Sequence, residues 1–295
     1  MTPISEEMQG AIARAAGLSF WKGPVTPEPI TGGITNVNLK VEDGGEAYVV
    51  RIGADLPVHQ IMRFNERAAA KAAEAAGISP EVVHTEPGVM VIRFVEGRSC
   101  AAADIPERLP QILPLLKRVH RELPRFLYGP ALAFWPFHVI HSYVHTLEAA
   151  GSRYASRLPE LVDVAASLEL AVGPIDMVFG HNDLLPQNFI DDGTRLWLID
   201  WDYAGFNSPL FDLANLASNA RLDAEQEGWV LSTYYGRAPD EALWRSYRAM
   251  KCASLLREAM WSMASEIYST IDFDYAAYTL DYMDRFAQAH AAFRR

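Results

Sequence analysis

The sequence has little cysteine and no cluster of basic residues, and these absences exclude several classes of protein. Cys100 and Cys252 are its only cysteines and lie far apart, so neither a disulfide framework nor a thiolate metal site is expected. Its 295 residues include 26 Lys and Arg against 37 Asp and Glu, a formal net charge of −11. This balance argues against a nucleic-acid surface and suits a cationic ligand better.

Long apolar runs are also missing. No stretch approaches the roughly 18 residues that span a bilayer, so no membrane insertion is expected. The start, MTPISEEMQG, has neither the basic nor the apolar segment of a signal peptide. With so little cysteine, the simplest expectation is a reduced, cytoplasmic protein.

Residues 1–97 are predicted to form a small lobe of antiparallel strands with one helix packed on it. Hydrophobic periodicity and glycine turns give the order of its elements. They are a helix over 6–17 that ends at Gly17, strands with glycine turns over 29–53, a long amphipathic helix over 58–77, and short strands over 80–85 and 88–97.

Residues 98–295 are predicted to form a larger, mainly helical lobe. Helices are expected over 105–123, over 141–158 and in most of the chain after 207, and the only clear strands are 188–190 and 195–200. The chain is therefore expected to form an α+β, bilobal fold with a connector near 94–97 and a cleft where the lobes meet.

The stretch HNDLLPQNFIDDGTRLWLID carries the polar residues that most strongly indicate chemistry. Four residues separate Asp183 from Asn188, the spacing of a kinase catalytic loop, and Asp200 follows a predicted hairpin. Capping of the hairpin by turn residues is the plainer alternative. The functional reading makes Asp183 the base for a hydroxyl proton, with Asn188 and Asp200 as oxygen ligands of Mg²⁺. His181 and Asp212 are better read as residues that brace this loop.

Two features upstream fit the same chemistry. The loop TGGITN lies between two predicted strands, where its backbone amides suit nucleotide phosphates, although such turns are also common in hairpins. Arg51 ends a predicted strand where a kinase carries a phosphate-contacting lysine, and Glu66 on the next helix suits its ion-pair partner. The predicted nucleotide-binding set is Thr31, Gly32, Gly33, Thr35, Asn36, Arg51 and Glu66.

These motifs resemble those of a known family, and the resemblance implies a nucleotide-binding lobe over 1–97 and a catalytic and acceptor-binding lobe over 98–295. HNDLLPQNFI, IDWDYAGF and FDLANLASN resemble the bacterial choline/ethanolamine kinase branch of the aminoglycoside-phosphotransferase-like superfamily, from about residue 30 to the C-terminus. The resemblance implies a protein-kinase-like fold and transfer of phosphate from ATP, with Mg²⁺, to a small alcohol. It assigns the base to Asp183, the metal to Asn188 and Asp200, and a second metal-site carboxylate to Asp202.

The same resemblance implies an aromatic box for a cationic acceptor, formed by Tyr203, Trp261 and Tyr278. Such a box suits a quaternary ammonium, although Trp261 and Tyr278 also suit a helical core. Glu258 stands where choline kinases often have a second tryptophan, and Asn219 where an acidic residue is expected. A carboxylate at Glu258 favours a primary ammonium such as that of ethanolamine.

The acceptor therefore stays open at this point. Choline or ethanolamine is the leading prediction, and thiamine or an aminoglycoside is an alternative within the superfamily. A nucleotide-binding pseudokinase or scaffold is an alternative of a different class, but a scaffold has no need of Asp183, Asn188 and Asp200 together.

Overall fold

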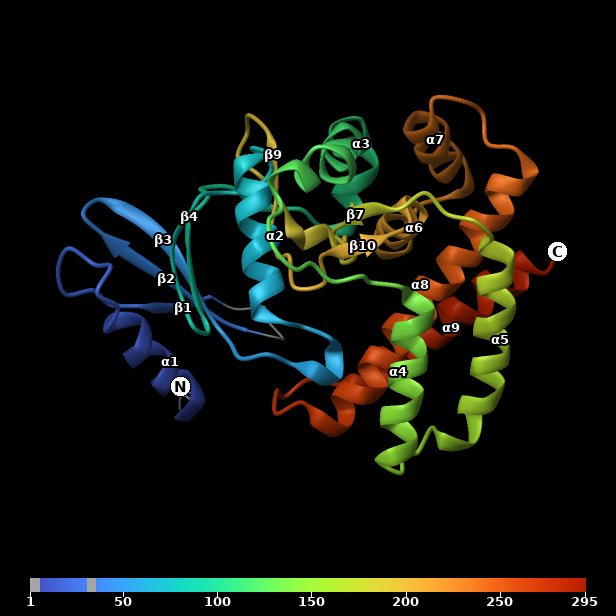
Figure 1. Cartoon of the computed structure of the whole chain (residues 1–295), viewed down its shortest axis with the longest axis horizontal. Coiled ribbons are helices and arrows are strands. Elements are labelled where there is room, and N and C mark those ends of the chain that lie inside the picture. The colour runs from blue at the N-terminus through green and yellow to red at the C-terminus, as the bar shows by residue number, and fades with distance from the viewer. Residues whose placement is uncertain (1–5, 31–35) are drawn as a thin grey trace.

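Two lobes lie side by side in the computed structural model, which describes residues 6–30 and 36–295 (Figure 1). Thr31, Gly32, Gly33 and Thr35 of the predicted phosphate loop lie outside the described residues. A twisted sheet with helix α1 forms the smaller lobe, and the larger lobe is built from helices. This is the bilobal α+β arrangement predicted from the sequence.

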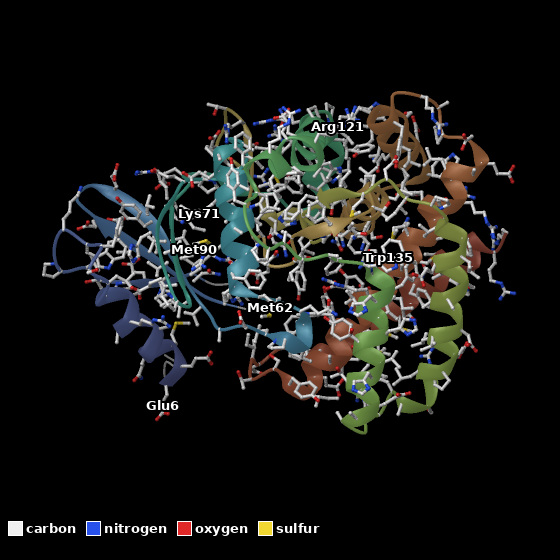
Figure 2. The ribbon with its side chains drawn as sticks, in the orientation of Figure 1. Glu6, Met62, Lys71, Met90, Arg121 and Trp135 are labelled. Atoms are coloured by element: carbon white, nitrogen blue, oxygen red, sulfur yellow. The ribbon has the colours of Figure 1, made fainter. Side chains whose placement is uncertain are left out.

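The smaller lobe is an antiparallel sheet of five strands in the order β1-β2-β3-β5-β4, with a helix on either face. Alternate residues of a strand point to opposite faces. Val89 and Val91 accordingly pack in the cluster around α1, whereas Met90 packs between the sheet and α2 (Figure 2). The elements are α1 (Glu6–Ala16), β1 (Glu28–Ile30), β2 (Val37–Asp43), β3 (Glu46–Ile52), α2 (Arg63–Ala75), β4 (Val82–Glu86) and β5 (Val89–Arg93).

Helix α2 begins five residues later than the hydrophobic periodicity of 58–77 predicted. Pro57–His59 forms a short 3-10 turn, and Gln60 has a left-handed backbone with φ of 60°. A bridge between Leu56 and Ile61 closes this turn. Apolar residues continue through the turn because they pack against the larger lobe, so periodicity alone could not show where the helix starts.

The larger lobe is organised around α8, against which α4, α5, α6 and α9 pack (Figure 1). The expected helix over 141–158 is interrupted in the structure: α4 ends at Ala149, Gly151 turns with φ of 62°, and a 3-10 helix over Ala155–Arg157 leads into α5. The helices are α3 (Ile105–Arg121), α4 (Pro136–Ala149), α5 (Leu158–Val172), α6 (Pro209–Ala220), α7 (Ala224–Tyr235), α8 (Glu241–Tyr268) and α9 (Tyr275–Phe293). Among the described residues, no helix is long and apolar enough to cross a membrane.

Short strands hold the chain segments that carry the predicted site. The two predicted strands are present as β8 (Phe189–Asp191) and β9 (Leu196–Leu198). The structure adds three strands that the sequence did not reveal: β6 (Arg98–Ser99), β7 (Val178–Gly180) and β10 (Gly205–Asn207). Strand β6 pairs with β8, and β7 pairs with β10. Strands of two or three residues are too short to show an alternation of apolar and polar residues in the sequence. They form only where a neighbouring strand is available for pairing.

Contacts between distant segments join the lobes. Ser79, which follows α2, donates a hydrogen bond of 2.5 Å from its hydroxyl to the Leu198 carbonyl and accepts one of 2.8 Å from Trp201 Nε1. In the connector, Gly97 lies so close to β8 that a Cβ there would meet the Asp191 carbonyl at 2.7 Å. The base of the smaller lobe is therefore fixed against the hairpin β8–β9.

Candidate functional site

The loop between β7 and β8 is held by one buried carboxylate. Asp212, at the start of α6, accepts the backbone N–H groups of His181 at 2.9 Å and Asn182 at 2.7 Å. It also pairs with His120 Nε2 at 2.9 Å. Burial by itself would raise the pKa of the Asp212 carboxyl. Hydrogen bonds and charge interactions with His120 and His181 outweigh that effect, so the pKa is lowered. Asp212 is thus the acceptor for loop amides that the sequence predicted.

Asp183 stands at the open end of this loop and is partly exposed. Its backbone N–H donates to His181 Nδ1 at 3.2 Å, while His181 Nε2 donates to the Ile199 carbonyl at 2.9 Å. His181 is fully buried, so it braces the loop as predicted. Burial and the charge of Glu258 raise the pKa of Asp183 well above its ordinary value, although Arg257 opposes them.

Asn188 and Asp200 meet where the hairpin β8–β9 returns to the loop. Asn188 Nδ2 donates to the Asp183 carbonyl at 2.9 Å, and the Ile199 amide donates to the Asn188 carbonyl at 3.0 Å. Asp200 follows with a left-handed backbone, φ of 70°, and its side chain is 29% exposed. An amide oxygen and a carboxylate are hard oxygen donors of the type that Mg²⁺ prefers.

Asn188 and Asp200 provide too few ligands to bind Mg²⁺ by themselves, but they fit an ion that a bound nucleotide also coordinates. Within 6–30 and 36–295, no group of three or more His, Cys, Asp or Glu is arranged to hold a metal. Mg²⁺ in kinases usually takes one or two protein oxygens together with phosphate oxygens and water. Asn188 and Asp200 would supply the protein's share.

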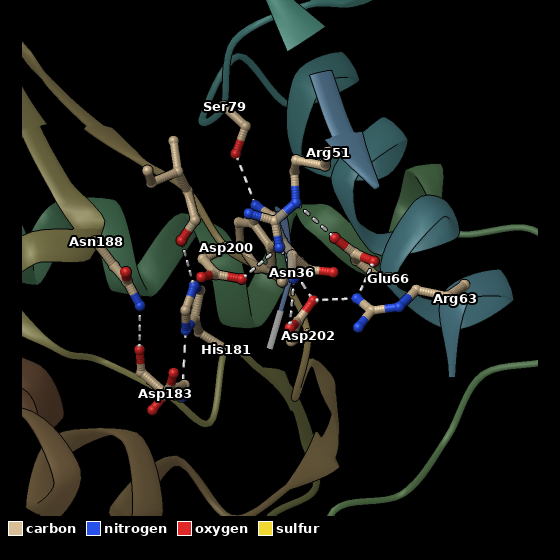
Figure 3. A network of polar contacts seen from close by, with 12 residues as sticks. Asn36, Arg51, Arg63, Glu66, Ser79, His181, Asp183, Asn188, Asp200 and Asp202 are labelled. Carbon is tan, nitrogen blue, oxygen red and sulfur yellow. Dashed lines mark hydrogen bonds and ion pairs between the residues drawn. The ribbon is translucent and has the colours of Figure 1, made fainter. Parts of the chain in front are cut away.

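Arg51 joins the smaller lobe to Asp200, the predicted metal ligand (Figure 3). Its Nε donates to Glu66 at 2.9 Å, and its Nη2 donates to Asp200 at 2.8 Å and to Asp202 at 3.1 Å. Burial alone would lower the pKa of Arg51, but the three carboxylates raise it. For Glu66, burial raises the pKa to about 7 although the two nearby arginines oppose it. The structure thus contains the predicted pair of Arg51 and Glu66.

Asp202 is the centre of the same network. It is 3% exposed, its Oδ1 accepts from Arg51 and from Arg63 at 2.9 Å, and its Oδ2 accepts from Asn36 at 3.1 Å. A metal role for Asp202 stays a prediction. Asp202 also has a structural role, because its hydrogen bonds connect β3, α2 and the segment at Asn36 to the larger lobe.

The predicted acceptor residues come together along α8. The rings of Trp261 and Tyr278 lie 6.0 Å apart, and the Tyr278 hydroxyl donates to Glu258 Oε1 at 2.9 Å. Tyr203 is linked to them through Arg257, whose guanidinium lies 4.4 Å above the Tyr203 ring. Trp261 and Tyr203 are 5% and 7% exposed, so they are also part of the core.

Two cavities share Asn36: the first is lined by residues of the smaller lobe, and the second lies between the lobes. One, of about 730 Å³, reaches Arg51, Arg63 and Glu66. The other, of about 600 Å³, reaches Trp261. The predicted nucleotide residues and one predicted acceptor residue therefore border neighbouring spaces.

Three residues of the site were missed from the sequence. Arg63 lies three residues before Glu66, so its place on the same helical face was a usable signal. Arg257 stands in the apolar run SLLREAMW, and a charge inside such a helix was a second signal. His59 had no local signal, since it reaches the site through the turn before α2.

His59 is held neutral beside Trp261. Its ring lies 5.5 Å from the Trp261 ring, its Nδ1 is 3.1 Å from the Tyr143 hydroxyl, and its Nε2 is 3.3 Å from Ser265 Oγ. Burial, with the charge of Arg257, lowers the pKa of His59 to about 4. An unfolded histidine takes up its proton near pH 6.5. The stability that depends on neutral His59 is therefore lost as the pH falls from about 6.5 to 4.

We expect His59→Gln to weaken the acid sensitivity of the fold. Between pH 7 and 4.5 the free energy of unfolding should fall about 2 to 3 kcal/mol less in this variant than in the wild type. Urea unfolding at a series of pH values measures the difference, and His138→Gln, at an exposed position of α4, is the control. Parallel curves for wild type and His59→Gln would show that the native pKa of His59 is close to that of an unfolded histidine.

Comparison with known proteins identifies relatives of this chain. Residues 26–252 match the family described as phosphotransferase enzyme family. The LicA protein of Haemophilus influenzae is 31% identical over 69% of the chain, and the match spans 61% of LicA.

Solved structures agree with the fold. A choline/ethanolamine kinase family protein from Mesorhizobium loti is 27% identical with a TM-score of 0.74, covering 95% of this chain and 94% of that one. The choline kinase LicA from Streptococcus pneumoniae is 23% identical with a TM-score of 0.79, covering 98% and 100%. The protein-kinase-like fold predicted from the sequence is confirmed.

Proposed function

Because the chain belongs to the phosphotransferase enzyme family, we propose that it is an ATP- and Mg²⁺-dependent kinase of a small cationic alcohol such as choline or ethanolamine. The observation that carries the proposal is the hydrogen-bonded unit of Asp183, Asn188 and the Ile199–Asp200 strand end. A partly exposed carboxylate beside two oxygen donors supports proton removal from a hydroxyl next to a metal-bound phosphate.

In the proposed reaction each residue has one task. The acceptor hydroxyl oxygen forms a bond to the γ-phosphorus of ATP, and the bond from that phosphorus to the bridging oxygen of ADP breaks. The hydroxyl proton passes to Asp183. Asn188 and Asp200 would hold Mg²⁺, which would supply positive charge against the phosphates. Arg51, fixed by Glu66, supports the same phosphates.

Relatives and pocket chemistry support the choice of acceptor. The solved relatives are described as a choline kinase and a choline/ethanolamine kinase family protein. The aromatic faces of Trp261 and Tyr278 suit an alkylammonium group. An aminoglycoside, with several ammonium groups, would need more carboxylates than Glu258 supplies.

An ADP-release assay with choline, ethanolamine, thiamine and kanamycin tests the proposal. We expect acceptor-dependent ADP formation with choline or ethanolamine, and its loss when EDTA removes Mg²⁺. A reaction without acceptor measures background hydrolysis. If ADP formed with thiamine or kanamycin but with neither choline nor ethanolamine, the proposed acceptor class would be wrong. Nucleotide binding without phosphate transfer to any of the four would favour a pseudokinase.

A further inference from the structure

The acceptor end of the site contains buried hydrogen-bonding atoms that the described residues do not satisfy. They are Nε and Nη2 of Arg257, the hydroxyl of Tyr203 and Nε1 of Trp261. Buried polar groups in proteins are nearly always paired, so each such atom calls for an explanation. Here the unpaired atoms occur on three residues of one site.

Two of these atoms belong to Arg257, a charged residue that an aromatic box for a cation does not need. Arg257 is 1% exposed, and its guanidinium lies 4.4 Å from the Tyr203 ring centre and 5.2 Å from that of Phe134. The aromatic face predicted to hold the acceptor's cation therefore already holds a cation of the protein. Arg257 lies four residues before Trp261, so the two project from one face of α8.

Arg257 uses one of its nitrogens within the protein. Nη1 donates to Glu258 Oε2, and the other carboxylate oxygen of Glu258 accepts from Tyr278 at 2.9 Å. Glu258 is thus paired with Arg257, so an ammonium group at Glu258 would meet an ion pair of the protein and not a lone anion. The charges of both residues act on the Asp183 carboxyl, so they lie near the predicted position of the reacting hydroxyl.

The chemistry of the unpaired atoms selects the ligand. Arginine and tryptophan nitrogens can only donate hydrogen bonds. A quaternary ammonium accepts none, and a primary ammonium is itself a donor. A carboxylate accepts two parallel hydrogen bonds from a guanidinium. A phosphate dianion would suit the place less, because Asp183 and Glu258 would repel its second charge.

We infer that the preferred acceptor is a zwitterionic alcohol, whose carboxylate pairs with Arg257 and whose ammonium group lies at Glu258 and Trp261. The inference rests on the proposed kinase activity for the role of the hydroxyl, but the binding preference stands apart from it. A protein ion pair, Arg257 with Glu258, is complementary to the two opposite charges of such a ligand. The group transfer to the hydroxyl is the one already described.

Matched pairs of alcohols test the inference. Serine is ethanolamine with a carboxylate on the carbon that bears nitrogen, and carnitine is choline with a carboxymethyl group on the hydroxyl-bearing carbon. Calorimetry should show that the wild type binds at least one carboxylate-bearing member about tenfold more tightly than its partner. Arg257→Met should reduce that preference to about twofold or less. Arg245→Met, an exposed arginine earlier on α8, should keep it.

Because Arg257 is buried, the fold of each variant is checked by circular dichroism, and Arg257→Lys serves if the methionine variant does not fold. Lysine retains the charge but not the two parallel donors, so the preference should fall at least threefold. Equal or tighter binding of choline and ethanolamine, binding of none of the four, or an unchanged preference in both variants would overturn the inference. A clear preference without ADP release would support the inference and contradict the proposed kinase activity.

Discussion

Replacing Asp183 by asparagine is expected to lower kcat by about 10²–10⁴-fold, the contribution typical of a general base. Nucleotide affinity should change little, because Asp183 makes its loop contacts through backbone groups: its N–H binds His181 and its carbonyl binds Asn188. Asparagine has nearly the same shape and preserves those contacts. Steady-state ADP release gives kcat, and titration with a non-hydrolysable nucleotide gives the affinity.

Asp176→Asn is the matched control, since Asp176 is exposed shortly before the same loop. Its kcat should equal that of the wild type. If Asp183→Asn kept kcat within about threefold of the wild type, another group would have to accept the proton. If it lost nucleotide binding as well, the role of Asp183 would be structural.

Arg51→Met is expected to remove activity and destabilise the fold by about 3–5 kcal/mol, the cost of breaking a buried charge pair by deleting one partner. Glu66 and Asp202, which are 4% and 3% exposed, would keep Arg63, whose side chain is 13% exposed, as a cation partner. Asp200 would lose its link to the smaller lobe. Urea unfolding measures the stability, and ADP release measures the activity.

The destabilisation should depend on pH in a defined direction. Burial already raises the pKa of Glu66 to about 7, and without Arg51 it should rise further. A carboxyl with a raised pKa in the folded state stabilises the fold at low pH and loses that effect as the pH rises through the folded value. The deficit of Arg51→Met should therefore shrink as the pH falls from about 8 to 5.5.

Arg93→Met, on β5 of the same sheet, is the control for Arg51. The Arg93 side chain is 39% exposed and pairs with Glu46 at 2.9 Å and Glu81 at 3.0 Å. Its removal should cost about 1 kcal/mol or less. If both substitutions lowered the free energy of unfolding equally, the buried ion pairs of Arg51 would stabilise the fold no more than the exposed pairs of Arg93.

The sequence predicted those parts of the site that lie close together along the chain or follow a kinase-like order. The spacing from Asp183 to Asn188 and the hairpin before Asp200 are local, and the family and fold inferred from them are confirmed by the comparisons. Arg51 and Glu66 could be paired because strand and helix occur in the expected order.

The remainder depended on contacts between distant segments. His59 meets Tyr143 and Ser265 only after the turn before α2 has folded against the larger lobe. Arg257 had a local signal, but its stacking on Tyr203 joins α8 to a loop more than fifty residues earlier. A periodic pattern contains no information on such pairs, and it also could not distinguish a core aromatic residue from a pocket wall.

The network around Asp202 also limits how this chain can be recombined with its relatives. Arg51 and Arg63 come from one side of the connector, whereas Asp200 and Asp202 come from the other. A chimera that exchanges only the first 97 residues keeps these pairs only if the donor carries compatible charges at both arginine positions. The two halves of the molecule are therefore expected to be inherited together, and crossover points that leave the network intact should fall outside the segment from Asn36 to Asp202.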